Sequence, residues 1–332
     1  MKHTLYKRIV KLAIALILSG CASNTPVQND APHHVTVIRP PVHKIPEQQP
    51  SQGLTGIYAN SLPAKHFIQH MVREHGFSED YLNGLFSRAN RLDYVIRLET
   101  PEPYHGPKPA HPKVGGWTRY RKQFITDAHI NNGVAFWGNN AEAIQKASAT
   151  YGVDPEYIVA IIGVETFYGR NVGKTRTFEA LTTLAFDTQR RAKFFTSELE
   201  NFLLMTREEN YEVFKPVGSW AGAMGLGQFM PSSFRKLAVD FNNDGRRDLW
   251  DQDDAIGSVA HYFSRSGWQS NRPVAEPAKS YSDDAVITLS ADTGNEHWRV
   301  HPNFKVIKKY NNSDKYAMAV HQLAQAIKQR RL

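Results

Sequence analysis

The sequence of 332 residues predicts a mainly helical protein of the α+β class, with a small β element near its C-terminal end. Apolar side chains recur at helical spacing in most segments after about residue 61. Strand-like runs occur only late, at residues 286–289 and 298–300. With 41% hydrophobic and 22% charged residues, the composition is that of an ordinary globular protein that can bury a large core.

Residues 1–20 are expected to be a signal peptide. Basic side chains precede an apolar run at residues 12–18 that is too short to span a bilayer. Small residues lead into Cys21, the only cysteine, so no intrachain disulfide can form. The pattern resembles a bacterial lipobox, in which this thiol is lipidated; the alternative is a secreted protein with a chance cysteine near the cleavage site. Ala22 resembles the sorting pattern for the outer membrane, so we expect a lipid anchor at its periplasmic face.

The segment 21–53 contains six prolines among polar residues, which predicts an extended tether that reaches from the membrane. The region 54–332 then carries the folded protein. Helices are expected over about residues 61–76, 78–86, 139–151, 154–169, 179–186, 194–206 and 313–330, with a further helix that starts with Trp117, Tyr120, Phe124 and Ile125, and a β element at about 275–308.

The net charge of +8 is a weak guide to partners. Four of the excess positive charges lie before residue 21, so the remainder carries +4. This modest balance suits an anionic polymer, but no dense basic stripe or nucleic-acid-binding motif is present. We therefore expect no nucleic-acid partner.

The segment 154–169 contains the first candidate for chemistry. Asp154 is a good helix N-cap, Pro155 suits the first helical position and Gly169 offers a stop. Glu165 falls on the apolar stripe that Ile161 and its neighbours form. Burial raises the pKa of a carboxyl group and keeps it protonated, as a general acid requires. A buried Glu paired with an Arg for structure is the alternative.

A glycine-rich stretch at 218–234 is the second candidate. Four glycines in ten residues disfavour a regular helix and allow the backbone to approach a ligand closely. Ser219 and Gln228 offer polar groups to a sugar, and Met224 offers an apolar contact to a ring face. A tight structural turn explains the glycines equally well.

An Asp-rich stretch at 240–254 is the third. Asp240, Asn242 and Asp244 occupy alternate positions, and Gly245 follows, as in the first half of an EF-hand loop. The backbone carbonyl of Arg246 would supply position seven. Asp251 stands at position twelve, where its shorter side chain leaves Asp254 as the alternative closing ligand. Hard oxygen ligands at this spacing predict a structural Ca²⁺ ion; the alternative is an Asp-rich turn without metal.

Several motifs in the same order resemble the membrane-bound lytic murein transglycosylase B family, from about residue 54 to the C-terminus. They are VETFYGRNVGK at 164–174, the Arg pair at 190–191, GSWAGAMGLGQFMPSS at 218–233, the Asp-rich loop, and YNNSDKYAMAV at 310–320. The resemblance implies a lysozyme-like core flanked by an all-helical lobe and a small β lobe. It also implies one EF-hand-type Ca²⁺ site, with a closing carboxylate that corresponds to Asp254.

The resemblance further implies that Glu165 is the catalytic residue. The implied sugar-contacting residues are Tyr120, Arg190, Arg191, Ser219, Met224, Gln228, Tyr262, Tyr310, Asn311 and Tyr316. Taken alone, an Arg pair is more often a solvated face, and tyrosines at helical spacing are more often core. Phe194 replaces an expected tyrosine, and the stretch between Tyr262 and Tyr310 is short for the family.

The implied reaction is cleavage of peptidoglycan between N-acetylmuramic acid and N-acetylglucosamine, with formation of 1,6-anhydromuramyl ends. A single Glu165 acts as acid and then as base, because the substrate itself supplies the nucleophile. The alternatives are a lysozyme-type muramidase that uses water and an inactive peptidoglycan-binding lipoprotein. A Ca²⁺ sensor is disfavoured because only one loop is visible. The protein is expected to be a monomer.

Overall fold

The computed structural model describes residues 53–100, 114–278 and 285–332, which form two compact units. The smaller unit ends at Arg88 and the larger one begins at Ala89. The predicted signal peptide, Cys21 and nearly all of the predicted tether lie outside the described residues. Among the helices that are described, none is long and apolar enough to cross a bilayer.

The smaller unit is a short helical element. It contains η1 (Gly56–Tyr58), α2 (Leu62–His75) and α3 (Glu79–Ser87). Gly76 ends α2 in the left-handed region with φ 65°, and the hydroxyl of Ser78 caps α3 by accepting from the backbone N–H of Tyr81. The rings of Phe67 and Phe86 pack edge to face at 5.8 Å between centroids. Both helix boundaries agree with the sequence prediction.

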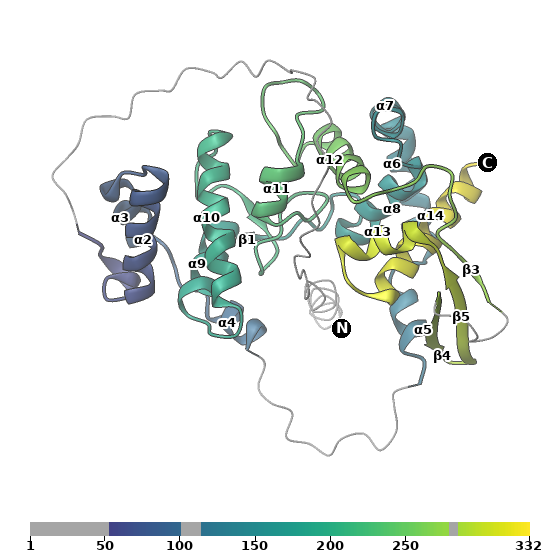
Figure 1. Cartoon of the computed structure of the whole chain (residues 1–332), viewed down its shortest axis with the longest axis horizontal. Helices are drawn as coiled ribbons and strands as arrows, with labels where there is room; N and C mark the ends of the chain where they lie inside the picture. The colour runs from purple at the N-terminus through teal and green to yellow at the C-terminus, as the bar shows by residue number, and fades with distance from the viewer. Residues whose placement is uncertain (1–52, 101–113, 279–284) are drawn as a thin grey trace. The chain divides into compact units, whose positions relative to one another are not determined.

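The larger unit is also mainly helical, which confirms the predicted fold class (Figure 1). Its helices are α4 (Asp93–Glu99), α5 (Gly116–Arg121), α6 (Asp127–Asn139), α7 (Ala141–Tyr151), α8 (Pro155–Thr166), α9 (Thr177–Phe186), α10 (Ala192–Glu208), α11 (Pro231–Leu237), α12 (Gln252–Arg265), α13 (Pro302–Tyr310) and α14 (Asp314–Arg331). Its strands are β1 (Thr175–Arg176), β2 (Val217–Gly218), β3 (Ala275–Pro277), β4 (Val286–Ala291) and β5 (Gly294–Val300).

Helix α8 lies at the centre of this unit and packs against α6, α7, α12 and α14 (Figure 1). Every residue from Glu156 to Val164 is buried, so the apolar stripe predicted from the sequence is one side of a helix that is covered all round. Asp154 does not cap α8 with its side chain, contrary to the prediction. Its carboxylate accepts instead from Trp268 Nε1 at 2.8 Å and from the Asn271 backbone N–H at 3.1 Å.

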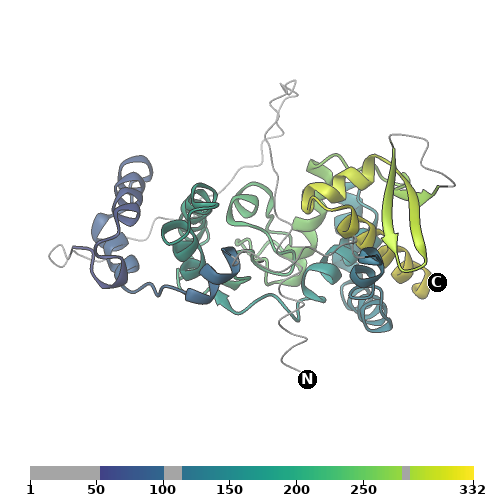
Figure 2. The ribbon, with the colours of Figure 1, turned by 90° about the horizontal axis from the view of Figure 1, so that it is seen from below.

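The β element is an antiparallel sheet with the strand order β3-β5-β4 (Figure 2). The hairpin β4–β5 closes at Ala291 and Gly294, and Gly294 has φ 125°. The predicted β segment 275–308 is too long at its C-terminal end, because Pro302 occupies the first turn of α13. The helix expected to start near Trp117 is α5, but it ends at Arg121, before Phe124 and Ile125.

Candidate active site

Glu165 lies on the last turn of α8 and is half-buried. The phenol of Tyr316, at the start of α14, donates a hydrogen bond of 2.5 Å to its Oε1 atom. Burial raises the pKa of Glu165 to about 7, although the Tyr316 hydrogen bond acts in the opposite direction. Near neutral pH this carboxyl group can therefore both release and accept a proton.

Three more tyrosines predicted from the sequence lie close enough to Glu165 to feel its charge. Burial raises the pKa of Tyr120, Tyr262 and Tyr310, and the negative charge of Glu165 raises each further, to about 12 for Tyr262. The Tyr262 and Tyr310 rings lie 4.6 Å apart, and the Tyr310 hydroxyl donates to the Gly227 carbonyl at 2.6 Å. These phenols stay protonated, and the Tyr262 hydroxyl donates to the Lys309 carbonyl at 2.7 Å, so Tyr262 and Tyr310 direct their protons to the backbone and not to Glu165.

The turn after α8 holds Glu165 in place. The helix ends at Thr166 and not near Gly169 as predicted, because Phe167 and Tyr168 both adopt left-handed backbone angles, with φ 52° and 60°. Such angles are unusual for bulky residues and persist only where the surroundings enforce them. The Tyr168 hydroxyl donates to the His129 carbonyl at 2.8 Å.

Two helix glycines make room for the Tyr168 ring. A Cβ atom at Gly133 of α6 would lie 2.5 Å from the Tyr168 hydroxyl, and one at Gly163 of α8 would lie 2.6 Å from it. Tyr168 could not be predicted from the sequence, since no local pattern places an aromatic residue in the left-handed region. The two glycines within helical segments were the available signal, because a helix tolerates glycine at a cost that packing must offset.

The glycine-rich stretch forms an irregular loop that leans on the end of α8. Thr166 donates its hydroxyl to the Leu226 carbonyl at 2.9 Å, which joins the end of α8 to the loop. Gln228 has φ 52°, and its amide donates to the Gly225 and Val172 carbonyls. The loop therefore has a fixed shape beside Glu165, as close backbone packing by glycines allows.

The predicted polar contacts of this loop are partly engaged within it. The Ser219 oxygen accepts from the Ala223 backbone N–H at 3.0 Å, so its own proton remains available for donation. Met224 is fully buried and lies beneath the loop, with no surface for a ligand in this structure. Asn311 is buried too, and within the described residues its Oδ1 atom has no hydrogen-bond partner.

The Arg pair binds a buried carboxylate. Arg191 makes two hydrogen bonds to Glu99, and Arg190 Nε lies 3.2 Å from the same side chain. Burial raises the pKa of Glu99, but the hydrogen bonds and charges of the two guanidinium groups outweigh it and hold the pKa below its usual value. Phe194, where a tyrosine was expected, is 38% exposed. This cluster has a structural role irrespective of any ligand.

Glu179, a buried carboxylate on α9, is engaged in other contacts. Its Oε1 atom accepts from the side chain of Asn90 at 2.7 Å and lies 3.7 Å from Arg176. Burial and the Tyr316 hydrogen bond account for the shifted pKa of Glu165, and in the described part of the chain no carboxylate contributes to it.

The Asp-rich loop folds its side-chain oxygens inward. Asp240, Asn242 and Asp244 each accept a backbone N–H from the loop at 2.9–3.1 Å, and Gly245 turns the chain with φ 90°. Asp254 is fully buried and accepts from the Phe241 and Asp248 backbone N–H groups.

Asp251 has another role. Its side chain caps α12 by accepting the backbone N–H groups of Asp253 and Asp254. Because Asp251 is engaged as the cap of α12, Asp254 is the better placed of the two candidate closing ligands. This set of hard oxygens around a glycine turn fits a Ca²⁺ ion.

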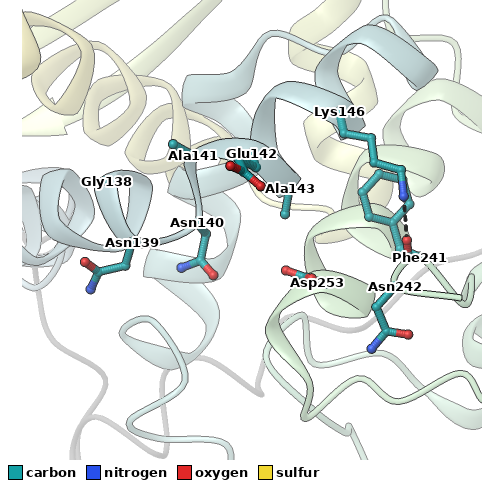
Figure 3. A pocket seen from close by; sticks show the side chains of 10 residues that line it. All are labelled: Gly138, Asn139, Asn140, Ala141, Glu142, Ala143, Lys146, Phe241, Asn242 and Asp253. Atoms are coloured by element: carbon teal, nitrogen blue, oxygen red, sulfur yellow. Dashed lines mark hydrogen bonds between the residues drawn. The ribbon is translucent and has the colours of Figure 1, made fainter. Parts of the chain in front are cut away.

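A cavity of about 640 Å³ opens beside this loop, between the start of α7 and the start of α12 (Figure 3). Lys146 lies on its wall and donates to the Phe241 carbonyl at 2.8 Å, which braces the Asp-rich loop against α7. The cavity is separate from the candidate active site, since its lining does not include Glu165, Tyr120, Tyr262, Tyr310 or Tyr316.

Comparison with known proteins identifies the family. The model of the transglycosylase SLT domain matches residues 61–288 and 275–325. The membrane-bound lytic murein transglycosylase B of Escherichia coli is 40% identical over 361 aligned residues, which cover 97% of this chain and 98% of that protein.

Solved structures of lytic transglycosylases also resemble this chain. The E. coli lytic transglycosylase SLT35 in complex with bulgecin A is 42% identical, with a TM-score of 0.77 over 84% of this chain and 96% of that one. SLT35 has also been solved with calcium. SltB1 from Pseudomonas aeruginosa is 40% identical, with a TM-score of 0.75 over 83% of this chain and 100% of that one. The chain therefore belongs to the membrane-bound lytic murein transglycosylase B family.

Proposed function

We propose that this lytic transglycosylase cleaves the β-1,4 bond between N-acetylmuramic acid and N-acetylglucosamine in peptidoglycan, with Glu165 as the only catalytic carboxylate. The observation that carries the proposal is the 2.5 Å hydrogen bond from Tyr316 to a half-buried Glu165 whose pKa is about 7. P. aeruginosa SltB3, which is 27% identical with a TM-score of 0.69 over 80% of this chain and 78% of that one, has been solved in complex with NAG-anhNAM-pentapeptide.

In the first step, protonated Glu165 donates its proton to the glycosidic oxygen. The bond from C1 of the muramyl residue to that oxygen breaks, and the N-acetylglucosamine leaves with a free hydroxyl group. The 2-acetamido oxygen of the muramyl residue stabilises the positive charge at C1. The hydroxyl of Ser219, whose oxygen already accepts from the loop, donates to the acetamido group.

In the second step, ionised Glu165 takes the proton of the 6-hydroxyl group on the same muramyl residue. The 6-oxygen then bonds to C1 and closes the 1,6-anhydro ring, so no water is consumed. Closure within one bound sugar is favoured over attack by water because the reacting atoms are already held together. The Tyr316 phenol stabilises the ionised carboxylate between the two steps.

Digestion of purified sacculi followed by mass spectrometry tests this reaction. We expect muropeptides with 1,6-anhydromuramyl ends, and their complete loss in Glu165→Gln. Reducing ends in place of anhydro ends would show a lysozyme-type muramidase and overturn the proposed chemistry. Unchanged digestion by Glu165→Gln would remove Glu165 from the mechanism.

The Asp-rich loop is proposed to hold one structural Ca²⁺ ion through Asp240, Asn242, Asp244, the Arg246 carbonyl and Asp254. Its support is the inward-facing oxygen set, together with the calcium complex of the related SLT35. Bound there, the ion would fix the chain between α11 and α12 and take no part in the chemistry.

Attachment to the outer membrane is proposed to occur through a lipid on Cys21. The lipobox-like residues before Cys21 support it, as does the E. coli relative that is named membrane-bound. Cell fractionation tests the anchor: Cys21→Ser should move the protein from the membrane fraction to the soluble fraction. A Cys21→Ser protein that still sediments with membranes would reject it.

A further inference from the structure

Glu165 and Ser219 serve the same muramyl residue in the proposed reaction, but they lie on different elements. Glu165 is on the last turn of α8, whereas Ser219 lies in the glycine-rich loop between β2 and α11. Glu165 has to reach the glycosidic oxygen while Ser219 holds the acetamido group. The distance between these two side chains therefore depends on what joins the end of α8 to the loop.

Thr166, the residue after Glu165, makes this connection. Its buried hydroxyl oxygen lies 3.1 Å from the Ile162 carbonyl of its own helix and 2.9 Å from the Leu226 carbonyl, so the two acceptors share its single proton. The same oxygen accepts from the Gly169 backbone N–H at 3.0 Å. A bond to the carbonyl four residues earlier is common for a threonine in a helix, whereas the bond to Leu226 spans 60 residues.

The Asp-rich stretch holds Leu226 from the other side. The Leu226 backbone N–H donates to the carbonyl of the fully buried Leu249 at 2.8 Å, so both polar backbone groups of Leu226 are bound. Gly225 permits this approach, because it has φ 69° and a Cβ atom there would lie 2.3 Å from Leu249 Cβ. Trp250 Nε1 donates to the Val217 carbonyl at 3.2 Å, which gives the loop a second attachment at its start.

The loop is also cross-linked by its own backbone. The Ser219 N–H donates to the Ala223 carbonyl at 2.8 Å, and Met224 and Phe229 exchange two N–H···O bonds of 2.9 and 3.0 Å. Leu226 lies between Met224 and Phe229, and Ser219 is joined to the same ladder. A displacement of Leu226 therefore displaces the Ser219 end of the loop as well.

We infer that Thr166 is a positioning residue for the proposed reaction, whose hydroxyl fixes the distance between Glu165 and Ser219. The inference rests on the proposed function, since only a reaction that uses both side chains on one muramyl residue needs that distance fixed. Thr166 is 1% exposed, so it does not reach a bound glycan. Its loss should lower kcat and leave KM nearly unchanged, because misplacement of a reacting group slows the chemical step.

Steady-state kinetics on soluble, peptide-free glycan strands tests this role. Thr166→Val keeps the shape of the side chain without its hydroxyl and should lower kcat about tenfold, with KM within about twofold of the unmodified enzyme. Thr166→Ser keeps the hydroxyl and should retain kcat within about threefold. Thr166→Cys, which has only a weak S–H donor, replaces Thr166→Val if that variant does not fold.

Thr206→Val is the matched control. Thr206 is 3% exposed, lies near the end of α10 and donates to the Leu203 carbonyl of the same helix at 2.9 Å. This variant loses a buried hydroxyl without a bond to the glycine-rich loop, so its kcat should stay within about twofold of the unmodified enzyme. All variants are assayed well below their melting temperatures.

A double-mutant cycle with Trp250→Phe separates positioning from a general loss of stability. Trp250→Phe removes the second attachment of the loop and should lower kcat about threefold. Once Thr166→Val has disconnected Glu165 from the loop, the attachment at Trp250 no longer sets their distance. The double variant should therefore have nearly the kcat of Thr166→Val alone.

Four results would overturn the positioning role: an unchanged kcat in Thr166→Val, a rise of KM that accounts for its loss, equal impairment of Thr166→Ser, or independent losses in the double variant. An unmodified enzyme that forms no 1,6-anhydromuramyl ends on these strands would instead reject the proposed function, so the two failures are distinguishable.

Discussion

Tyr316 donates a 2.5 Å hydrogen bond to Glu165 from a helix that follows it by 151 residues in the sequence. Burial raises the pKa of Glu165, and the hydrogen bond from the Tyr316 phenol lowers it. The balance leaves the pKa at about 7. One carboxyl group can then act as acid and as base because neither its protonated nor its ionised form is strongly favoured at neutral pH.

Tyr316→Phe should move the pH dependence of the reaction. Loss of the hydrogen bond removes the contribution that lowers the pKa of Glu165, so the pKa rises and the fall in activity on the basic side shifts to higher pH. The maximal rate should fall about tenfold, because ionised Glu165 loses a charge-assisted partner. The pH–rate profile of sacculus digestion measures both. Tyr81→Phe, in the smaller unit, is the control; an unshifted basic limb in Tyr316→Phe would contradict the assignment.

Glu165→Gln should stabilise the fold, and only at high pH. The pKa of Glu165 is raised on folding from 4.5 to about 7, so the stability of the folded state falls as pH rises between these values. Glutamine has no charge to bury, so the variant should gain up to about 3 kcal/mol at pH 8 and almost nothing at pH 4. Urea unfolding at both pH values measures the difference. A gain of equal size at pH 4 would point to a cause other than ionisation.

Asp254→Asn and Asp251→Asn should separate the two candidate ligands of the Asp-rich loop. Asp254 is buried within the loop, so removal of its charge should weaken Ca²⁺ binding at least about tenfold. Asp251 caps α12, and Asn caps a helix equally well, so Asp251→Asn should bind Ca²⁺ nearly as the unmodified protein does. Calorimetry on chelator-treated protein provides the affinities. The opposite order would make Asp251 the closing ligand, and no binding by the unmodified protein at millimolar Ca²⁺ would reject the site.

Gly163→Ala should disturb the turn that carries Glu165. The new methyl group would lie 2.6 Å from the Tyr168 hydroxyl, so the ring must leave its slot, and we expect a loss of about 2 kcal/mol in unfolding free energy. Activity should fall more than tenfold, because Glu165 lies between Gly163 and Tyr168 on the same turn. Gly84→Ala in α3 is the matched control: its Cβ would meet nothing within 4 Å, so it should be neutral or slightly stabilising. Full activity in Gly163→Ala would show that the slot does not position Glu165.

The sequence was a good guide wherever local chemistry decides the structure. Helical periodicity predicted most of the helices, and Gly76 and Ser78 marked boundaries correctly. The sequence was a poor guide where residues far apart in the chain bind the same side chain. Asp154 was assigned to a helix cap because its neighbours suit one, but Trp268 and Asn271 take its carboxylate.

The candidate active site shows the same difference between features set by local sequence and features set by distant contacts. Glu165 stood out because a carboxyl group on an apolar stripe is unusual, and the tyrosines around it entered only through family resemblance. The left-handed Phe167 and Tyr168 could not be foreseen, because their backbone angles are imposed by contacts with α6. The pairing of Arg190 and Arg191 with Glu99 could not be predicted either, since 91 or more residues separate the partners.

The distance in sequence between Glu165 and Tyr316 has a consequence for biosynthesis. Glu165 is synthesised midway along the chain, whereas its hydrogen-bond partner Tyr316 is synthesised much later, with α14. A ribosome-bound or truncated chain that lacks α14 has the carboxyl group without the partner that tunes it. The hydrogen bond between the two side chains can therefore form only once α14 docks beside α8.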